Sequence, residues 1–267
     1  MKTIKLIFYA GLIGLWTTQA FAQALPSAKE IINKVNARNE GPYVTQEFTM
    51  ELTDRRGKKQ LRKTVSYRKD YEGQRKSVLF FSSPTNVKGT GFLTFDYHDA
   101  DKDDDQWLYL PALRKTRRIS AANRGDYFLG TDLTYEDIKK GTKISREDYT
   151  FKTLKKEQVD GKQCYLVEAI PVNDKIAKEL KHSKVHFYID PKTWISLKNE
   201  YWDISGNPLK TTEIEALVLI DNIWTVQKIN AVNHKTGHRS ILTFSGSDYK
   251  TELEDDLFVE QTLLRGR

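Results

Sequence analysis

Residues 149–170 of the chain read YTFKTLKKEQVDGKQCYLVEAI. Two segments of alternating polar and apolar residues flank the dipeptide Asp160-Gly161. Alternation with a period of two places every second side chain on the same face of a sheet. Asp-Gly readily adopts the left-handed backbone of a two-residue turn. The stretch therefore predicts an antiparallel hairpin with strands over 149–159 and 162–170.

Alternation of the same kind recurs on both sides of this hairpin. The intervening turns carry Gly, Asn, Asp and Pro, which suit the backbone angles that tight turns require. About eleven short antiparallel strands joined in this way predict one highly curved sheet or open barrel, in a single domain. The expected strands lie at residues 43–53, 61–68, 75–81, 92–97, 106–110, 115–119, 184–189, 194–203, 208–220, 223–232 and 238–245, besides the hairpin.

A helix is expected before the first strand, over residues 27–36. Ser27 is a suitable N-cap, and Glu30 stands three residues later, as in a capping box. Gly41-Pro42 ends the element. One face of this helix is apolar because Ala28, Ile31, Ile32 and Val35 recur at helical spacing. A shorter helical or irregular insertion is expected at 173–182, and loops with short helices at 120–140.

The sequence leaves open how the space over the concave face of such a sheet is occupied. The aliphatic and aromatic side chains of this face either fill the space or leave a cavity for an apolar ligand. The abundant aromatic residues, which make up 11% of the chain, are compatible with both outcomes.

The N-terminus resembles a secretory signal. Lys2 and Lys5 precede an apolar run at residues 6–16, which is too short to span a bilayer comfortably. Ala20-Phe21-Ala22 supplies a cleavage pattern, so we expect a signal peptide at 1–22 and a mature domain at 23–267. No cysteine follows the cleavage site, so a lipid anchor is not expected. These features predict a soluble, exported protein of the periplasm.

Cysteine and charge set further bounds. Cys164 is the only cysteine, so the chain forms no internal disulfide, and we expect a buried, inert thiol.

The formal net charge is +7. This modest bias permits contact with acidic lipid headgroups or an acidic partner. Nucleic acid is not an expected partner, because the chain has no basic tail and no nucleic-acid motif.

Sequence motifs of enzymes are missing or misplaced. Ser66 and Lys69 form a Ser-x-x-Lys sequence, but positions three apart in a strand point to opposite faces. There is no Gly-x-Ser-x-Gly, phosphate-loop or dinucleotide sequence. The acidic run 99–105 begins like a calcium loop but lacks its glycine and its final glutamate. The pairs His182/His186 and His234/His238 lack a third ligand. We expect no catalytic residue, metal or cofactor.

The densest mixture of aromatic, basic and acidic residues lies in the middle of the chain. It comprises residues 107–111, the basic side chains Arg114, Lys115, Arg117 and Arg118, and then residues 128–132 and 135–137. In a strand, Arg114 and Arg118 share one face, and Lys115 and Arg117 share the other. Either all four are solvated, or an arginine pairs with Asp126, Asp132 or Asp137, or holds a lipid headgroup.

This central run, together with Pro84 and Lys88-Gly89, resembles the signature of the LolA-like periplasmic outer-membrane lipoprotein-sorting proteins. Residues 84–89 are similar to the family's Pro-x-x-x-Lys-Gly segment. Residues 107–111, 117–119 and 128–137 are similar to its central signature. The resemblance extends over nearly the whole mature chain and is closest to members associated with exporters of the resistance-nodulation-division (RND) type.

The resemblance implies a mainly β fold with a few helices: a half-open, highly curved antiparallel β-barrel of about eleven strands, with helices covering the concave face. It implies a carrier that binds lipid or lipoprotein acyl chains for transport towards the outer membrane. An RND-type exporter and an outer-membrane acceptor are the implied partners, and a monomer is expected. The alternative is a non-carrier accessory protein that binds an envelope exporter or machine through its surface.

Two sets of residues are candidates for this site. The predicted ligand-binding residues on the concave face are Phe48, Met50, Leu52, Tyr67, Phe80, Phe95, Trp107 and Tyr109. The signature residues predicted to contact a lid or headgroup, or to fix a loop, are Arg117, Arg118, Asp126, Phe128, Asp132 and Asp137.

Overall fold

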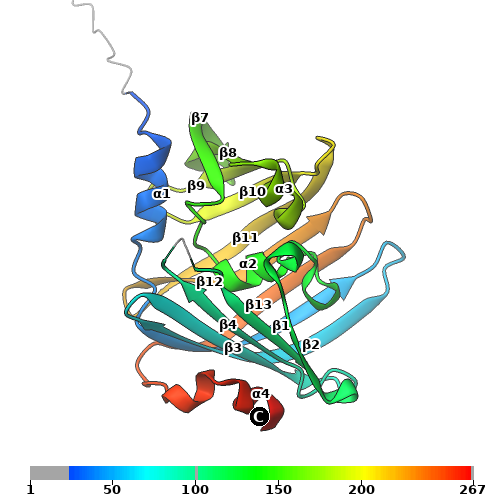
Figure 1. The fold of residues 1–267 in the computed structure, drawn as a ribbon. Helices are drawn as coiled ribbons and strands as arrows, with labels where there is room; N and C mark the ends of the chain where they lie inside the picture. Colours follow the sequence, from blue (N-terminus) through cyan, green and yellow to red (C-terminus); the bar gives the residue numbers. More distant parts are fainter. Residues whose placement is uncertain (1–23, 100–101, 266–267) are drawn as a thin grey trace, which may run out of the picture.

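The computed structural model describes residues 24–99 and 102–265, so the predicted signal peptide lies outside the described residues. Thirteen strands pair into one antiparallel sheet, in the order β6-β5-β4-β3-β2-β1-β13-β12-β11-β10-β9-β8-β7 (Figure 1). Strands β6 and β7 form its two edges and do not pair with each other, so the sheet stays open within the described chain.

The first half of the chain contributes one side of this sheet. Its elements are α1 (Ala28–Asn36), β1 (Tyr43–Thr53), β2 (Lys59–Tyr71), β3 (Gln74–Ser83), β4 (Gly91–Tyr97), β5 (Asp105–Leu110), the 3₁₀ turn η1 (Pro111–Leu113) and β6 (Lys115–Arg118). Residues 119–148, here called the crossing segment, then connect the two edges of the sheet. The segment contains η2 (Ala121–Asn123), η3 (Phe128–Gly130) and α2 (Tyr135–Lys140).

The second half builds the remainder of the sheet and returns to β1. Its elements are β7 (Tyr149–Val159), β8 (Lys162–Pro171), α3 (Asp174–Leu180), β9 (Lys184–Ile189), β10 (Ser196–Trp202), β11 (Pro208–Ile220), β12 (Ile223–Asn233), β13 (Arg239–Asp248), η4 (Asp255–Phe258) and α4 (Glu260–Arg265).

The expected total of about eleven strands was too low, because every one of the thirteen segments with strand-like alternation finds a partner in the sheet. Even β6, which has only four residues, all exposed, joins the sheet through backbone pairing with β5. The hairpin at 149–170 is confirmed: β7 and β8 pair antiparallel, and Asp160 and Gly161 both have positive φ angles.

The register of the strands assigns two opposite faces to the sheet. Phe48 and Met50 of β1 lie opposite Phe244 and Leu242 of β13, and these residues define the inner face. Bulges interrupt β1, β7, β10 and β11. Since a bulge bends its strand and increases the local twist, these breaks help to curve the sheet.

Helix α1 has the capping box that the sequence predicted. The Ser27 side chain accepts a hydrogen bond from the Glu30 backbone, and the Glu30 carboxylate accepts one from the Ser27 backbone. The apolar stripe of α1, including Ile31 and Val35, is buried against inner-face residues of β8 to β10. This packing adds a second layer over one end of the sheet.

The chain ends against the outer face of the sheet, which the sequence pattern did not predict. Leu257 and Phe258 of η4 and Leu263 of α4 are buried with Val78, Phe80 and Leu93 of the sheet. Leu263 approaches Gly91 so closely that a side chain added there would clash. The C-terminal helix lies beneath β3 and β4 in Figure 1.

Within the described residues, no helix is long and apolar enough to cross a membrane.

Candidate ligand cavity

A cavity of about 660 Å³ lies between the inner face of the sheet and the crossing segment. Its size falls within the range of pockets that hold small organic ligands. Strands from both halves of the chain line the cavity, including β1 through Phe48, β3 through Leu79 and β13 through Phe244. The cavity therefore forms only when the complete sheet has assembled.

Apolar side chains form much of the cavity wall. The rings of Phe48 and Phe244 pack with their centroids 5.0 Å apart across β1 and β13. Leu242 and Ile229 occupy neighbouring positions of β13 and β12 and face the same way. Ile214 of β11 is paired with Ile229 and continues the wall. Such a wall can accept hydrocarbon, because burial of each CH₂ contributes about 0.8 kcal/mol.

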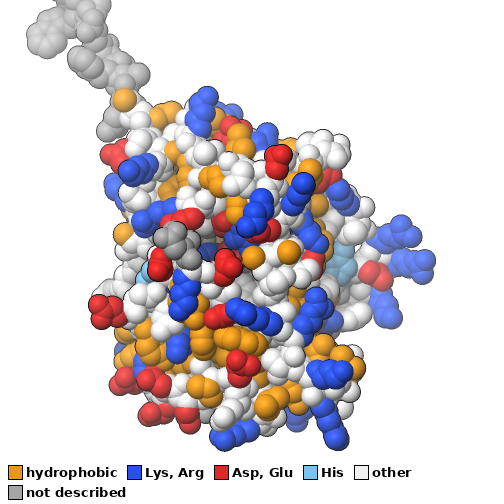
Figure 2. All heavy atoms as spheres, viewed as in Figure 1, with side chains coloured by type: hydrophobic (Ala, Val, Ile, Leu, Met, Phe, Trp, Pro, Cys, Tyr) orange, Lys and Arg blue, Asp and Glu red, His pale blue; other side chains and the backbone are white. Residues whose placement is uncertain are grey.

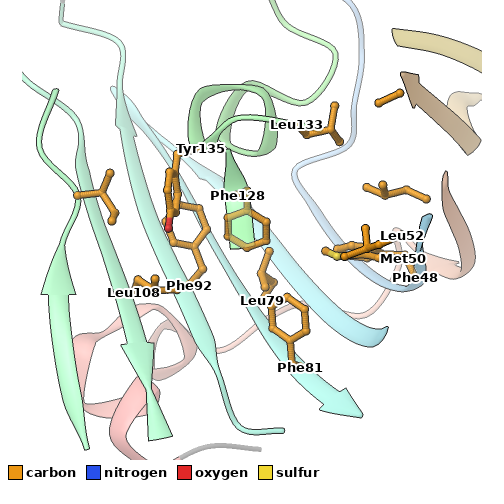
Figure 3. Close-up of a cluster of buried hydrophobic side chains, with 13 residues drawn as sticks. Phe48, Met50, Leu52, Leu79, Phe81, Phe92, Leu108, Phe128, Leu133 and Tyr135 are labelled. Atoms are coloured by element: carbon orange, nitrogen blue, oxygen red, sulfur yellow. The ribbon is translucent and has the colours of Figure 1, made fainter. Parts of the chain in front are cut away.

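The crossing segment packs an aromatic cluster against the inner face of the sheet. Phe128 lies 5.2 Å from Phe92 and 5.4 Å from Tyr135, measured between ring centroids. Figure 3 shows Phe128 directed towards Leu79 and Phe92 of the strands. Leu133 belongs to the same buried cluster and also lines the cavity. This cluster fixes one end of the crossing segment.

Three acidic signature residues anchor the crossing segment, each through a partner far away in sequence. Asp137 pairs with Lys210 of β11. Asp132 accepts hydrogen bonds from the Ser240 hydroxyl of β13 at 2.7 Å and from the ring of His238, just before β13, at 2.6 Å. Asp126 pairs with Lys181 at the end of α3.

Arg117 and Arg118 do not form the predicted pairs with these aspartates. Arg118 pairs with Asp105 of the adjacent strand β5 instead, because β6 lies at the edge of the sheet and its side chains are exposed. Arg117 is close enough to Asp126 to help lower the pKa of that carboxyl, but it forms no ion pair with it. The expected pairing of Arg117 or Arg118 with one of these aspartates is therefore not found, and the aspartates bind Lys181, Ser240, His238 and Lys210 instead.

Arg124 forms a second anchor of the crossing segment. Its guanidinium group binds Asp148 through two hydrogen bonds of 2.7 and 2.9 Å, and it lies 3.1 Å from Glu179 of α3. Burial alone lowers the pKa of Arg124, but the surrounding carboxylates outweigh burial and raise it. The group therefore remains charged and holds η2, α3 and the start of β7 together.

A third charged cluster lies around Glu40, at the cavity wall. Burial alone raises the pKa of the Glu40 carboxyl, but nearby cations outweigh burial and lower it to about 2. Arg75 is one of these cations, at 2.8 Å, and also binds Asp70. The other cations around Glu40 are Arg38, Lys143 and Arg68. This network joins the end of α1, the β2–β3 hairpin and the loop after α2.

His182 and two tyrosines form a buried cluster beside the Asp137–Lys210 pair. The Tyr149 hydroxyl and the His182 Nε2 atom lie 2.9 Å apart, and the two rings are stacked. Tyr201 packs edge-on against His182 and comes within 3.5 Å of Asp137. Burial, and then the nearby Lys210 charge, lowers the pKa of His182 to about 4.

The predicted ligand-binding residues divide between the two faces of the sheet. Phe48 and Tyr67 contribute to the cavity wall. Met50 and Leu52 lie in the inner-face cluster beside the cavity. The outer-face cluster under the C-terminal helix holds Phe80, Phe95, Trp107 and Tyr109 and also includes part of Tyr67. Strand alternation alone could not show which face points inward.

Most of the cavity-anchoring residues were not identified from the sequence. Lys210 lies on β11 and Ser240 on β13, in strands that look ordinary in the sequence. His238 immediately precedes β13 and was considered from the sequence only as a metal ligand. Lys210 is a buried lysine between the half-buried Leu209 and Thr211 of β11, and its burial could not be read from the alternation. Only the sheet register brings these residues next to the crossing segment.

Other sequence features are accounted for by the local structure. Ser66 faces inward with the cavity lining, whereas Lys69 pairs with Asp255 on the other side. Cys164 is buried on β8. Asp104 binds Lys139 and the Tyr97 backbone. Across the described residues, no group of three or more His, Cys, Asp or Glu side chains is placed to hold a metal ion.

The open curved sheet, the crossing segment and the apolar cavity define a protein of the half-barrel class. A family model described as an uncharacterized protein matches residues 73–265. No curated protein matches the sequence.

Solved structures give closer comparisons. A domain from Vibrio parahaemolyticus, named for outer membrane lipoprotein sorting, is 30% identical with a TM-score of 0.80, covering 88% of this chain and 97% of that one. A DUF1329 family protein from Desulfovibrio piger is 26% identical with a TM-score of 0.80, covering 88% and 96%. A LolA superfamily protein from Nitrosomonas europaea shares the fold at 19% identity and a TM-score of 0.66, covering 89% and 99%. The chain belongs to the LolA-like family of outer-membrane lipoprotein-sorting proteins.

Proposed function

We propose that the protein carries lipid or lipoprotein acyl chains through the periplasm towards the outer membrane. The observation that carries the proposal is the apolar cavity on the inner face of the open sheet, built around Phe48, Phe244 and Ile229. Acyl chains would lie against this wall, with α1 and α2 covering the concave face. Carriage requires no covalent chemistry, so the protein acts as a binding protein rather than an enzyme.

The charged groups around the cavity support this role. Asp137, Arg124 and Glu40 hold the crossing segment through partners on different elements. These ion pairs would hold the walls of the cavity apart when no cargo is bound. Their charged groups would also accommodate a polar lipid headgroup near the entrance. An RND-type exporter would be the donor-side partner, and a signal peptide at residues 1–22 would direct export.

Native mass spectrometry with lipid extraction tests the proposal directly. Protein purified from the periplasm under mild conditions is expected to carry a stoichiometric lipid or acylated peptide. An empty protein that also takes up no fluorescent acyl probe would overturn the carrier function and favour an accessory protein that acts through its surface.

A matched pair of variants links the binding to the cavity. Ile229→Trp adds bulk to the inner face and is expected to lower probe affinity by tenfold or more, since the added ring occupies cargo space. Thr243→Trp adds the same ring at an exposed position of β13, on the opposite face. Equal loss of probe binding in both variants would argue against the cavity as the binding site.

A further inference from the structure

The tip between β5 and β6 exposes an apolar side chain beside several basic ones. Leu113 of η1 is 62% exposed, although large apolar side chains are usually buried. Arg114 turns the chain with a positive φ of 49°, and Lys115 begins the edge strand β6. Both basic side chains are exposed. We call Leu113, Arg114, Lys115 and Lys88 the basic tip.

Lys88 joins this group from the neighbouring loop between β3 and β4. A side-chain atom added at Gly89 would lie 3.4 Å from the Pro111 ring, so the loop and η1 are in contact. Lys88 itself is exposed. The basic tip thus combines two chain segments at one end of the sheet.

The basic side chains of this tip have no acidic partners among the described residues. Arg118, further along β6, pairs with Asp105, whereas Arg114, Lys115 and Lys88 form no ion pair. Most other basic residues near the cavity are paired, as Lys210 and Arg124 show. An unpaired positive charge at an exposed tip is therefore available to an external anion.

A second exposed apolar side chain lies at the same end of the sheet. Leu264 of α4 is 56% exposed, and its neighbour Leu263 packs against Gly91 at the start of β4. Gly91 pairs with Tyr109, two residues before η1. Figure 2 shows hydrophobic and basic side chains together at the lower right, where the green tip of the chain lies in Figure 1.

We propose that the basic tip docks the protein on the surface of an anionic lipid bilayer. Lys and Arg near such a surface each strengthen binding about fivefold, and an exposed leucine can enter the interface. A bilayer fits better than an acidic protein because the tip projects an apolar side chain and basic groups outward together. This role goes beyond cargo binding, since it concerns where the carrier meets a membrane.

Vesicle co-sedimentation tests the docking. The mature protein, purified from the periplasm, is mixed with vesicles of phosphatidylcholine alone or with about 30% phosphatidylglycerol, at low and high salt. We expect stronger sedimentation with the anionic vesicles, by tenfold or more, and weaker sedimentation at high salt. Arg114→Gln/Lys115→Gln should lose on the order of tenfold of this affinity.

Matched controls separate local docking from net charge. Lys152→Gln/Lys156→Gln removes the same charge from β7, at the opposite edge of the sheet, and should retain nearly all of the binding. Leu113→Ser should weaken binding, whereas Leu219→Ser, at another exposed leucine, should not. Circular dichroism checks that each variant is folded.

Two outcomes would overturn the proposal. One is equal sedimentation of the wild-type protein with both kinds of vesicle, which includes no binding to either. The other is an equal loss of binding in the β7 control and the tip variant. Ile229→Trp, whose added ring narrows the cavity, should sediment like the wild type, so failure of cargo binding and failure of docking are distinguishable.

Discussion

Lys210 and Asp137 form an ion pair inside the protein, and the Lys210 side chain is only 2% exposed. Burial alone raises the pKa of the Asp137 carboxyl, but Lys210 and the Thr134 hydrogen bonds outweigh burial and lower it. The pair connects the first turn of α2 to β11. This buried pair is one of the contacts that join the crossing segment to the second half of the sheet.

Replacing Lys210 should strongly destabilise the protein. Lys210→Met leaves the Asp137 carboxylate buried without its partner, which costs about 3 to 5 kcal/mol in free energy of unfolding. Lys198→Met removes a partly exposed lysine that pairs with Glu200 and should cost less than about 1 kcal/mol. Urea unfolding measures both. If the two variants lose similar amounts of unfolding free energy, the buried pair contributes no more to stability than a partly exposed one.

His182 should make stability depend on pH in a defined window. Its pKa is about 4 in the folded protein and 6.5 when unperturbed. Because the folded state disfavours the proton, stability is fully present above pH 6.5 and falls as pH drops towards 4. The loss can reach about 3 kcal/mol.

The comparison with His182→Gln isolates this effect. Glutamine keeps a polar partner for the Tyr149 hydroxyl but does not titrate. Urea unfolding across the pH range should show a difference between wild type and variant that changes between pH 6.5 and 4. If the difference in unfolding free energy stays constant across this pH range, His182 does not contribute to the pH dependence of stability. The Glu40 carboxylate becomes protonated in the folded protein only at lower pH, because its folded pKa is about 2.

Elements differ in how well local sequence predicts them. Helix α1 follows from its capping box and apolar stripe, and the β7–β8 hairpin from Asp160-Gly161. The C-terminal elements η4 and α4 have only four and six residues and little local signal. They form because the outer face of β3 to β5 is apolar and requires cover.

The C-terminal elements should nevertheless contribute much of the stability. Phe258→Ala removes a fully buried ring and should cost about 3 to 5 kcal/mol. Leu264→Ala, in the same segment but 56% exposed, should change stability by less than about 0.5 kcal/mol. Chemical denaturation distinguishes the two. If Phe258→Ala is as stable as Leu264→Ala, the C-terminal segment does not stabilise the sheet.

The whole molecule separates its two apolar faces by function. The outer face is filled by η4 and α4, whereas the inner face retains a cavity of about 660 Å³. Strands adjacent in the sheet but distant in sequence, β1 and β13, meet at the centre of the cavity wall. The cavity therefore forms only after β1 and β13 have paired.

Cargo binding should stabilise the folded molecule. A ligand at about one hundred times its dissociation constant adds about 2.7 kcal/mol to the free energy of unfolding. Thermal unfolding with an acyl ligand should therefore give a higher Tm for the wild type and for Thr243→Trp. The shift should largely disappear in Ile229→Trp. An equal shift in all three proteins would place the ligand outside the cavity.

The candidate site was only partly predictable from the sequence. The acidic signature residues Asp126, Asp132 and Asp137 were identified, and they do anchor the crossing segment. Their partners could not be found, because these lie 55 to 108 residues away. Phe80 and Trp107 were predicted to line the inner face but lie on the outer face. The prediction failed because alternation along a strand defines two faces without showing which of them points inward.

The sequence by itself determined the local elements: the capped helix α1, the turns, and strands with one apolar side each. These follow from propensities and periodicities that act over a few residues. The tertiary structure decided how the strands pair, which face points inward, the ion-pair partners and the cavity. Each of these depends on contacts between segments far apart in the chain, and such contacts leave no periodic signal in either segment alone.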